Sequence, residues 1–388
     1  MKKLRVGVIY GGRSGEHEVS IASAAAIFKH LDRTRYEAVP IRIEKDGRWV
    51  LADKVPQALS ASEVIEQAKH AAARPGRAGR DTLMVSHPSE DTLVTIERRP
   101  SANAGGGEPD GAVVTGLGLD VVFPVLHGPY GEDGTVQGLL ELAAVPFVGC
   151  GVLASAVGMD KAAMKAMFAA HGLPQPDYAV LTHHEWTQAP EAQSARLLKL
   201  GLPLFVKPAN LGSSVGISKV KSAEGLAAAL DTAFAFDRKA VIEAGVPAPR
   251  EIECAVLGND EPAASVPGEV IPSREFYDYE AKYLDSGSQT IIPADLDPAI
   301  VVRVQSLAIQ AFKAIDGAGM ARVDFLLSRT TGALLLNEIN TIPGFTTISM
   351  FSKLWDASGV TYPALIDRLI ALAVERHGEK QRLRTSAF

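Results

Sequence analysis

This sequence has few cysteines and no net positive charge. Its 388 residues contain only two cysteines, Cys150 and Cys254, and the formal net charge is −6. Two cysteines in so long a chain provide neither a disulfide framework nor the spacing of a metal cluster. Both lie among apolar residues, which favours two small buried core residues. No basic run is interleaved with aromatic residues, so a nucleic-acid partner is not indicated.

Long apolar runs are also missing. No apolar stretch reaches the about 18 residues that a membrane-spanning helix needs. The apolar run after Met1-Lys2-Lys3 is short and ends in Gly-Gly-Arg without a cleavage-like site, which indicates a first strand rather than a signal peptide. Apolar residues make up 47% of the chain and charged residues 22%, as in ordinary globular proteins. We therefore expect a soluble cytoplasmic protein of two or three domains, without a membrane partner.

The pattern of apolar residues predicts α/β modules. A strand over residues 4–10, a helix over 19–31 and a strand over 36–43 form a βαβ opening. Further strands are predicted over residues 119–126, 146–149, 204–208, 240–244 and 251–257. Helices are predicted over residues 134–144, 162–171, 224–235, 298–315 and 362–376. No internal repeat is present, and three α/β modules account for the pattern.

Two apolar strands near residue 330 end in polar side chains. Residues i and i+2 of a strand point to the same face. Arg322 and Asp324 therefore share one face of their strand, as do Glu338 and Asn340 of theirs. A hairpin centred near Thr331 places Asp324 opposite Glu338, and Arg322 opposite Asn340. Carboxylates facing each other at about 5 Å repel.

A divalent cation would remove that repulsion. Carboxylate and amide oxygens are hard ligands, which suit Mg²⁺ held jointly with substrate phosphates. The alternative is a solvated polar hairpin end, against which the apolar flanks argue. Asp324, Glu338 and Asn340 are therefore the candidate metal ligands.

A loop of small residues over 210–217 contains Gly212, Ser213 and Ser214. Glycines let backbone N–H groups approach an anion, and the two hydroxyls add donors. The loop lacks the Gly-Lys-Ser/Thr of a Walker A motif, and an ordinary hairpin turn remains the alternative. Lys207, three residues earlier, favours a phosphate site, and Lys161 at a predicted helix start is a second candidate cation. Either lysine taken alone is more often a solvated surface residue.

Two glutamates flank a bend between apolar strands. The carboxylates of Glu243 and Glu251 can accept hydrogen bonds from a ribose or an adenine amine. Solvated strand ends are the alternative.

Seven segments then agree with one family, in family order and over most of the chain. They are Gly11-Gly12-Arg13-Ser14-Gly15-Glu16-His17-Glu18-Val19-Ser20, His127-Gly128-Pro129-Tyr130-Gly131-Glu132-Asp133-Gly134, Met159-Asp160-Lys161, Lys207-Pro208 with Gly212-Ser213-Ser214-Val215-Gly216, Phe276-Tyr277-Asp278-Tyr279-Glu280-Ala281-Lys282-Tyr283, Arg322-Val323-Asp324, and residues 337–344. With these segments the chain resembles the D-alanine–D-alanine ligases of the ATP-grasp superfamily.

The resemblance implies a three-domain ATP-grasp fold, α/β with an α+β C-terminal half and an N-terminal parallel-sheet (pre-ATP-grasp) domain. Residues 1–155 would contribute to the first D-alanine site, 156–245 would carry the phosphate loop, and 246–388 the lid loop and metal site. A homodimer is also implied. The implied reaction converts ATP and two D-alanine molecules into D-alanyl-D-alanine, ADP and phosphate through a D-alanyl phosphate and a tetrahedral intermediate, and supplies peptidoglycan precursor synthesis.

The resemblance also implies roles around the first D-alanine. Glu16 would hold its ammonium group, His127 would lie near it, and Ser213 and Tyr283 would join Glu16 in a hydrogen-bonded set. Glu16 can alternatively cap the following helix, and His127 can be a satisfied loop histidine. Lys282 and Tyr283 lie in a polar loop over residues 273–293, whose length suits a lid that excludes water from an acyl phosphate.

The remaining implied roles concern the second substrate and ATP. Arg322, with the Gly344 N–H, would stabilise the tetrahedral oxyanion, and Ser349 would bind the second carboxylate. Two Mg²⁺, for which Mn²⁺ can substitute, would lie on Asp324, Glu338 and Asn340. The residues implied to bind ATP are Lys161, Lys207, Gly212, Ser213, Ser214, Glu243, Val246, Glu251 and Lys282.

The chain departs from the family pattern in two places. Residues 52–118 are longer than in compact members, and Ala244-Gly245-Val246 replaces a Lys-aromatic-Leu sequence near the adenine, so a lysine contact is absent there. A D-alanine–D-lactate ligase is the main alternative, although Tyr283 favours the dipeptide. A catalytically idle regulatory ATP-binding module is a remote one, since Arg322, Lys282 and the metal ligands are all present.

Overall fold

The chain divides into two units, each built around sheets of its own. The computed structural model describes residues 2–58, 60–71, 79–98, 112–272 and 289–384. The first unit comprises Met1–Gly149, Gly344–Ser352 and Thr361–Phe388, and the second Cys150–Pro343 and Lys353–Val360. The end of the chain thus belongs to the unit formed by its beginning. The three-part division at residues 155 and 245 stays a prediction.

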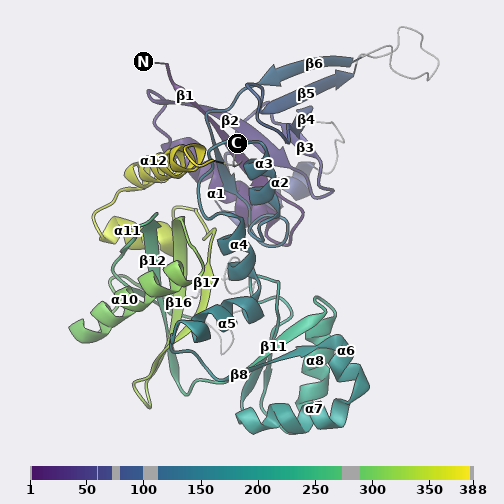
Figure 1. The fold of residues 1–388 in the computed structure, drawn as a ribbon, viewed down its shortest axis with the longest axis vertical. Helices are drawn as coiled ribbons and strands as arrows, with labels where there is room; N and C mark the ends of the chain where they lie inside the picture. Colours follow the sequence, from purple (N-terminus) through teal and green to yellow (C-terminus); the bar gives the residue numbers. More distant parts are fainter. Residues whose placement is uncertain (1, 59, 72–78, 99–111, 273–288, 385–388) are drawn as a thin grey trace, which may run out of the picture. The chain divides into compact units, whose positions relative to one another are not determined.

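The first unit contains a seven-stranded sheet in the order β6-β5-β4-β3-β2-β1-β7 (Figure 1). Strand β1, which lies next to the edge strand β7, pairs in parallel with both β2 and β7, as the predicted parallel sheet requires, whereas β2 to β6 pair antiparallel. Of the antiparallel strands, β4, β5 and β6 fall within the enlarged region over residues 52–118, whereas β2 and β3 precede it. The strands are β1 (Leu4–Gly11), β2 (Tyr36–Ile43), β3 (Trp49–Leu51), β4 (Arg80–Met84), β5 (Leu93–Arg98), β6 (Ala112–Leu117) and β7 (Val121–Val125).

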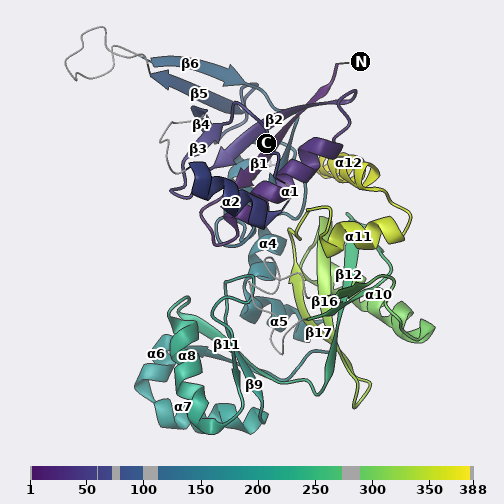
Figure 2. The same cartoon turned by 180° about the vertical axis from the view of Figure 1, so that it is seen from behind.

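Helices cover both faces of the parallel part of this sheet. Ile9 of β1 belongs to a core with Val136 and Leu140 of α3 (Thr135–Leu142). The next residue, Tyr10, points to the opposite face and contacts Phe28 of α1 (His17–His30) with ring centroids 6.1 Å apart. On that face α12 (Tyr362–Gln381) packs beside α1, as both views show (Figures 1 and 2). The remaining helix is α2 (Ala61–Ala71), which packs on α1.

The second unit contains two sheets. The smaller, in the order β10-β9-β11-β8, is antiparallel and packs against α7 (Pro190–Leu197) and α8 (Leu226–Phe234) through an apolar core that includes Val206, Leu230 and Ile242. Its strands are β8 (Tyr178–Thr182), β9 (Leu204–Pro208), β10 (Ser218–Val220) and β11 (Lys239–Ala244). Its other helical segments are α6 (His183–Gln188), η1 (Leu198–Leu200) and η2 (Ala223–Gly225).

The larger sheet of the second unit has six strands in the order β15-β14-β12-β16-β17, with β13 paired to β12. Its pairs are antiparallel. One face packs on α4 (Val152–Met159), α5 (Lys161–Ala170) and α10 (Pro298–Ala314) through residues such as Cys254, Phe325 and Phe312. The strands are β12 (Pro249–Gly258), β13 (Ala263–Ala264), β14 (Gly268–Ile271), β15 (Gln289–Ile291), β16 (Gly319–Ser328) and β17 (Leu334–Asn340).

One predicted strand is wrong and one expectation about the cysteines is confirmed. Residues 146–149 form no strand but a single parallel bridge between Val122 and Phe147. Cys150 and Cys254 are free and buried. In the described part of the chain no single helix is long and apolar enough to cross a membrane; α11 (Met350–Ala357) and α12, bent by 103°, pass that test only as a pair, by length and composition.

Candidate active site

A buried cluster of two lysines and one glutamate lies in the second unit. Lys207 is on β9 and Glu243 on the neighbouring β11, where Lys207 faces Val241 and Glu243 is therefore its diagonal neighbour. Lys207 Nζ donates to Glu243 Oε2 at 2.9 Å. Lys165 of α5 lies 3.2 Å from the other carboxylate oxygen, Oε1. The three side chains are nearly or completely buried, so Lys207 and Glu243 are not the solvated residues of the alternative interpretation.

The electrostatics of this cluster keep its glutamate ionised. Burial would raise the pKa of Glu243, but the charges of Lys207 and Lys165 outweigh that effect and hold the pKa below its ordinary value. Burial lowers the pKa of Lys165, against the attraction of Glu243. Two ammonium groups share one carboxylate, so the cluster carries an excess positive charge that suits a phosphate.

An irregularity in the hairpin of β16 and β17 brings a third element to Lys207. Asp324 pairs with Glu338, and the next residue, Phe325, pairs with Leu336, so Asn337 is the extra residue of a β-bulge. Its Oδ1 accepts a hydrogen bond from Lys207 Nζ at 3.2 Å. The bulge thereby links the two sheets of the second unit at the lysine cluster.

The predicted register of this hairpin is confirmed. Asp324 lies opposite Glu338, and Arg322 opposite Asn340. On the other side of β16, Glu253 of β12 lies opposite Asp324. Three carboxylates therefore form one row across three neighbouring strands, which we call the carboxylate row: Glu253, Asp324 and Glu338. The row lies on the face opposite the apolar core, because Cys254 and Phe325, adjacent to its members, belong to that core.

Arg322 neutralises part of the carboxylate row. Its Nε and Nη2 donate to the two oxygens of Asp324, both at 2.7 Å, and Nε also lies 3.0 Å from Glu253 Oε2. Asn340 Nδ2 donates to Asp324 Oδ2 at 3.0 Å. Burial disfavours the charged guanidinium, but the charges of Asp324 and Glu253 outweigh it and raise the pKa of Arg322 well above its ordinary value. With side-chain exposures of 16% for Arg322 and 13% for Asp324, a freely solvated hairpin end is excluded.

The chemistry of the row fits a divalent cation. Three carboxylates and one guanidinium make the row acidic, and carboxylate oxygens are hard donors. Asp324 and Glu338 are held opposite each other by the strand register, and the Asn340 amide lies on the same face. Asp324, Glu338 and Asn340 could together hold Mg²⁺, as the sequence predicted.

The predicted phosphate loop adopts a backbone that ordinary side chains rarely allow. Ser213, Ser214 and Gly216 have φ values of +50°, +58° and +73°. A Cβ on Gly216 would lie 2.6 Å from the Phe236 ring and 2.8 Å from Pro208 Cγ, so glycine is required there by both φ and space. Lys161 Nζ donates to the Leu211 carbonyl at 2.6 Å, which ties the start of α5 to this loop. Lys161 is buried and is therefore no solvated surface residue.

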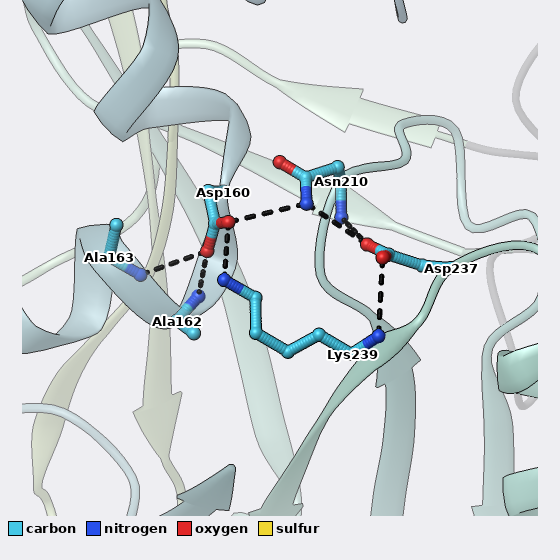
Figure 3. Close-up of polar contacts among 6 residues, drawn as sticks. All are labelled: Asp160, Ala162, Ala163, Asn210, Asp237 and Lys239. Carbon is cyan, nitrogen blue, oxygen red and sulfur yellow. Dashed lines mark hydrogen bonds and ion pairs between the residues drawn. The ribbon is translucent and has the colours of Figure 1, made fainter. Parts of the chain in front are cut away.

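A second polar network fixes the entrance to the loop (Figure 3). Asp160 caps α5 by accepting from the N–H groups of Ala162 and Ala163, both at 3.0 Å. Its Oδ2 binds Lys239 Nζ at 2.5 Å and the Asn210 amide at 3.2 Å, so one carboxylate joins α5, β11 and the loop. Asp237 accepts the Asn210 backbone N–H at 2.8 Å. Asn210 is thus held two residues before Gly212.

In the first unit, Glu16 and His127 come from the ends of adjacent parallel strands, β1 and β7. Glu16 precedes α1 but its side chain makes no capping hydrogen bond, so the capping alternative is wrong. Its carboxylate lies against Gly128, where an added Cβ would be 3.3 Å from Glu16 Oε2. His127, next to Gly128, is buried. Glu132 Oε1 accepts the Gly128 N–H at 2.7 Å and holds that loop.

Gly344 and Ser349 also lie close together in the first unit. A Cβ on Gly344 would be 3.1 Å from Ser349 Oγ. The Ser349 hydroxyl is held by Thr346, whose N–H donates to it at 3.0 Å. The segment is anchored by Phe345, whose ring packs on Phe123 and whose N–H donates to Ser23 Oγ at 3.2 Å.

Several predicted residues have less structural support. Lys282 and Tyr283 lie outside the described residues, so the lid stays a prediction. Val246 follows β11 and is half-buried, and Glu251 lies on β12 opposite Val270 and Leu326, two residues before Glu253. The implied adenine and ribose contacts of Val246 and Glu251 are untested predictions.

Two charged residues at this site were missed from the sequence. Lys165 lies four residues after Lys161 on α5, and Glu253 two residues after Glu251 on β12, so helical and strand spacing offered weak signals for both. Their ion pairs join elements far apart in the chain, which spacing alone does not reveal.

Comparison with known protein families shows to which family this chain belongs. The family model described as D-ala D-ala ligase N-terminus matches residues 5–150, and the model described as D-ala D-ala ligase C-terminus matches residues 167–371. The chain belongs to the D-alanine–D-alanine ligase family. Relatives of this ligase chain include the D-alanine--D-alanine ligases of Heliobacterium modesticaldum and Geobacillus kaustophilus. Both are 48% identical to it; the first alignment covers 98% of each sequence, and the second 98% of this chain and 97% of the relative.

Solved structures agree with the family and with the ATP-grasp fold. The D-alanine-D-alanine ligase from Coxiella burnetii is 37% identical, with a TM-score of 0.80 over 98% of this ligase-family chain and 97% of that chain. The VanG D-Ala:D-Ser ligase from Enterococcus faecalis is 31% identical, with a TM-score of 0.78 over 96% of this chain and 100% of its own. The family includes members whose second substrate differs, so the identity of the acceptor has to be tested for this chain.

Proposed function

We propose that this chain joins two D-alanine molecules with ATP, as a D-alanine–D-alanine ligase. The observation that carries the proposal is the combination, within the second unit, of a lysine-rich cluster beside a glycine loop and a carboxylate row with its arginine. The first feature suits phosphates and the second suits a metal and a developing negative charge. The full-length similarity to ligases with this name supports the same conclusion.

ATP is the first substrate of the proposed reaction. Lys161 and Lys207 would bind its phosphates together with the N–H and hydroxyl groups of Gly212, Ser213 and Ser214. Lys282 of the lid would join them. Glu243, Val246 and Glu251 would hold the adenine and ribose. Glu243 would then contact the nucleoside while it stays paired with its two lysines.

Mg²⁺, or Mn²⁺ in its place, would be held by Asp324, Glu338 and Asn340. Two such ions would spread the negative charge of the ATP phosphates during phosphoryl transfer. Before a metal ion binds, Arg322 and Asn340 hold the Asp324 carboxylate in place from two sides.

The first half-reaction activates a carboxylate. Glu16 would bind the ammonium group of the first D-alanine, with His127 beside it. A carboxylate oxygen of that substrate attacks the γ-phosphorus, the bond to ADP breaks, and D-alanyl phosphate forms. Ser213 and Tyr283 would complete the hydrogen bonds around Glu16, and the lid would exclude water, since an acyl phosphate otherwise hydrolyses.

The second half-reaction forms the peptide bond. Ser349 would bind the carboxylate of the second D-alanine, whose amino group attacks the acyl carbonyl and gives up a proton. Arg322 and the Gly344 N–H would stabilise the oxyanion of the tetrahedral intermediate, which collapses as the carbon–oxygen bond to phosphate breaks. The proposed setting is a cytoplasmic homodimer that supplies the dipeptide for peptidoglycan precursors.

Steady-state assays with alternative acceptors test the proposal. Purified protein with ATP, Mg²⁺ and D-alanine should release phosphate and D-alanyl-D-alanine in equal amounts, and L-alanine should give almost none. Adding D-lactate or D-serine to D-alanine should leave the dipeptide as the main product. A depsipeptide or a D-alanyl-D-serine product would assign a different second substrate, and ATP binding without turnover would favour the idle module.

A further inference from the structure

Glu253 is a buried charge at the site without a role in the proposed reaction. It lies opposite Asp324 at the end of the carboxylate row, and its side chain is 13% exposed. A buried carboxylate is costly unless it is paired. Its Oε2 lies 3.0 Å from Arg322 Nε, so its position in the row is tied to that guanidinium.

The contacts of Arg322 place two demands on Asp324. Asp324 accepts two hydrogen bonds from Arg322 and one from Asn340, yet it is also a proposed metal ligand. A carboxylate has about four lone-pair sites and three are used here, so a metal ion that takes more than one site displaces a hydrogen bond of Arg322 or Asn340. An arginine that lost Asp324 would need a second anion nearby to keep its position and its charge.

Glu253 is placed to be that second anion. Its Oε2 lies 3.0 Å from Arg322 Nε, the same atom whose N–H is donated to Asp324 Oδ1. A small rotation of the guanidinium would turn that N–H from Asp324 towards Glu253 without moving the backbone of Arg322. β12 and β16 pair over their full length, which keeps the two backbones fixed during such a change.

We propose that Glu253 is a positioning residue that retains Arg322 at the site when the oxygens of Asp324 are used for metal binding. This inference rests on the proposed function. Glu253 would act through Arg322 and touch neither substrate nor metal. It would allow one arginine to stabilise the row before the metal binds and the oxyanion afterwards.

Kinetics of Glu253→Gln test the positioning role, because glutamine keeps the shape and removes the charge. We expect kcat to fall about tenfold, the order expected for a lost charge-assisted contact, while the affinity for ATP measured without a metal ion changes by less than about twofold. Glu253→Asp, which keeps the charge with a shorter reach, should recover part of kcat and also covers the case in which the glutamine variant folds poorly. Equal losses in kcat and in affinity for ATP would overturn the proposal.

Glu269→Gln provides a matched control. It removes a buried glutamate–arginine pair from the same sheet, since Glu269 binds Arg250 Nη2 at 2.6 Å, but it lies on β14 outside the carboxylate row. We expect its kcat to stay within about twofold of the parent at a temperature where both are folded. A loss of kcat equal to that of Glu253→Gln would show a general structural effect and overturn the inference.

Binding of Mn²⁺ provides a readout that does not depend on turnover. In the presence of ADP, Glu253→Gln should weaken Mn²⁺ binding about three- to tenfold, because Arg322 then has only Asp324 to bind. The same substitution in an Arg322→Gln background should have little further effect. Equal weakening in both backgrounds would mean that Glu253 acts directly on the metal and would contradict the proposal. Absence of ligase activity in the parent protein, by contrast, would refute the proposed function alone.

Discussion

At the residue scale, the site depends on a buried cluster in which two lysines share one glutamate. Glu243 shares its two oxygens between Lys165 and Lys207, which come from a helix and a neighbouring strand. Each lysine is stabilised by the glutamate and repelled by the other lysine. The glutamate therefore contributes to the stability of the fold, apart from its proposed contact with a nucleoside.

We expect Glu243→Gln to destabilise the protein by about 3 kcal/mol, because it leaves two buried ammonium groups without their counter-ion. Urea unfolding at neutral pH measures this loss. Glu261→Gln, an exposed carboxylate of the same unit, is the control and should change the free energy of unfolding by less than about 0.5 kcal/mol. A Glu243→Gln variant as stable as its parent would contradict the assigned ion pairs.

The pH dependence of this contribution follows from the direction of the shift. The pKa of Glu243 lies below its ordinary value of 4.5 in the folded protein. Its stabilising effect is therefore complete above that value and is lost as the pH falls through the lower, folded pKa. The stability difference between the parent and Glu243→Gln should stay constant from neutral pH down to about pH 5 and shrink at more acidic pH. A difference that instead grew on acidification would contradict the sign of the shift.

Cys254 illustrates a buried group that the site does not use. Burial raises the pKa of its thiol to about 12 although Ser265 hydrogen bonds oppose the shift. Because thiolates are the reactive form, Cys254 should resist a thiol reagent in the folded protein and react fully in urea. Mass spectrometry of the labelled protein identifies the modified cysteine. Rapid labelling of Cys254 under native conditions would contradict its place in the core.

At the scale of elements, the loop over residues 210–217 depends on a left-handed backbone. Gly216→Ala should raise KM for ATP and lower stability by about 1–3 kcal/mol, because φ is +73° and the new methyl group meets Phe236 and Pro208. Gly201→Ala is the control, since φ is +85° but no atom lies within 4 Å of the added Cβ. If both variants showed the same KM for ATP, the steric role of Gly216 would be wrong.

Elements with strong local patterns could be predicted from the sequence. The strands over residues 36–43 and 204–208 were predicted with the bounds that the structure has, because turn residues flank two short, mostly apolar segments. The register of β16 and β17 followed from the spacing of Arg322, Asp324, Glu338 and Asn340. The bulge at Asn337 could not be predicted, since it depends on pairing across the hairpin.

The missed features depend on contacts between distant segments. Lys165 and Glu243 are 78 residues apart in sequence, and no local pattern connects α5 with β11. The strand predicted over residues 146–149 has the composition of a strand but forms only one bridge. Strand propensity is decided by neighbouring chains, which the sequence of one segment does not contain.

At the scale of the whole molecule, the last helix belongs with the first residues of the chain. Apolar residues of α12, including Leu369, are buried in the first unit, and Arg376 Nη1 donates to the Gly149 carbonyl. The amphipathic pattern of a helix shows that one face is buried, but it does not show which segment of the chain covers that face.

We expect Leu369→Ala to destabilise the first unit by about 2–5 kcal/mol through the cavity it leaves. Calorimetry should show a lower unfolding temperature for that unit. Val374→Ala on the same helix, where the side chain is 43% exposed, should change it little. Equal effects of the two substitutions would contradict the assignment of the buried face of α12.

The fate of the carboxylate oxygens tests the central claim most directly. The protein is incubated with ATP, Mg²⁺ and D-alanine labelled with oxygen-18 in its carboxylate, and the phosphate and dipeptide are analysed by mass spectrometry. Attack of the carboxylate on the γ-phosphorus predicts one labelled oxygen in each phosphate released, in proportion to the dipeptide formed. Unlabelled phosphate, or phosphate without D-alanyl-D-alanine, would contradict a ligase that acts through an acyl phosphate.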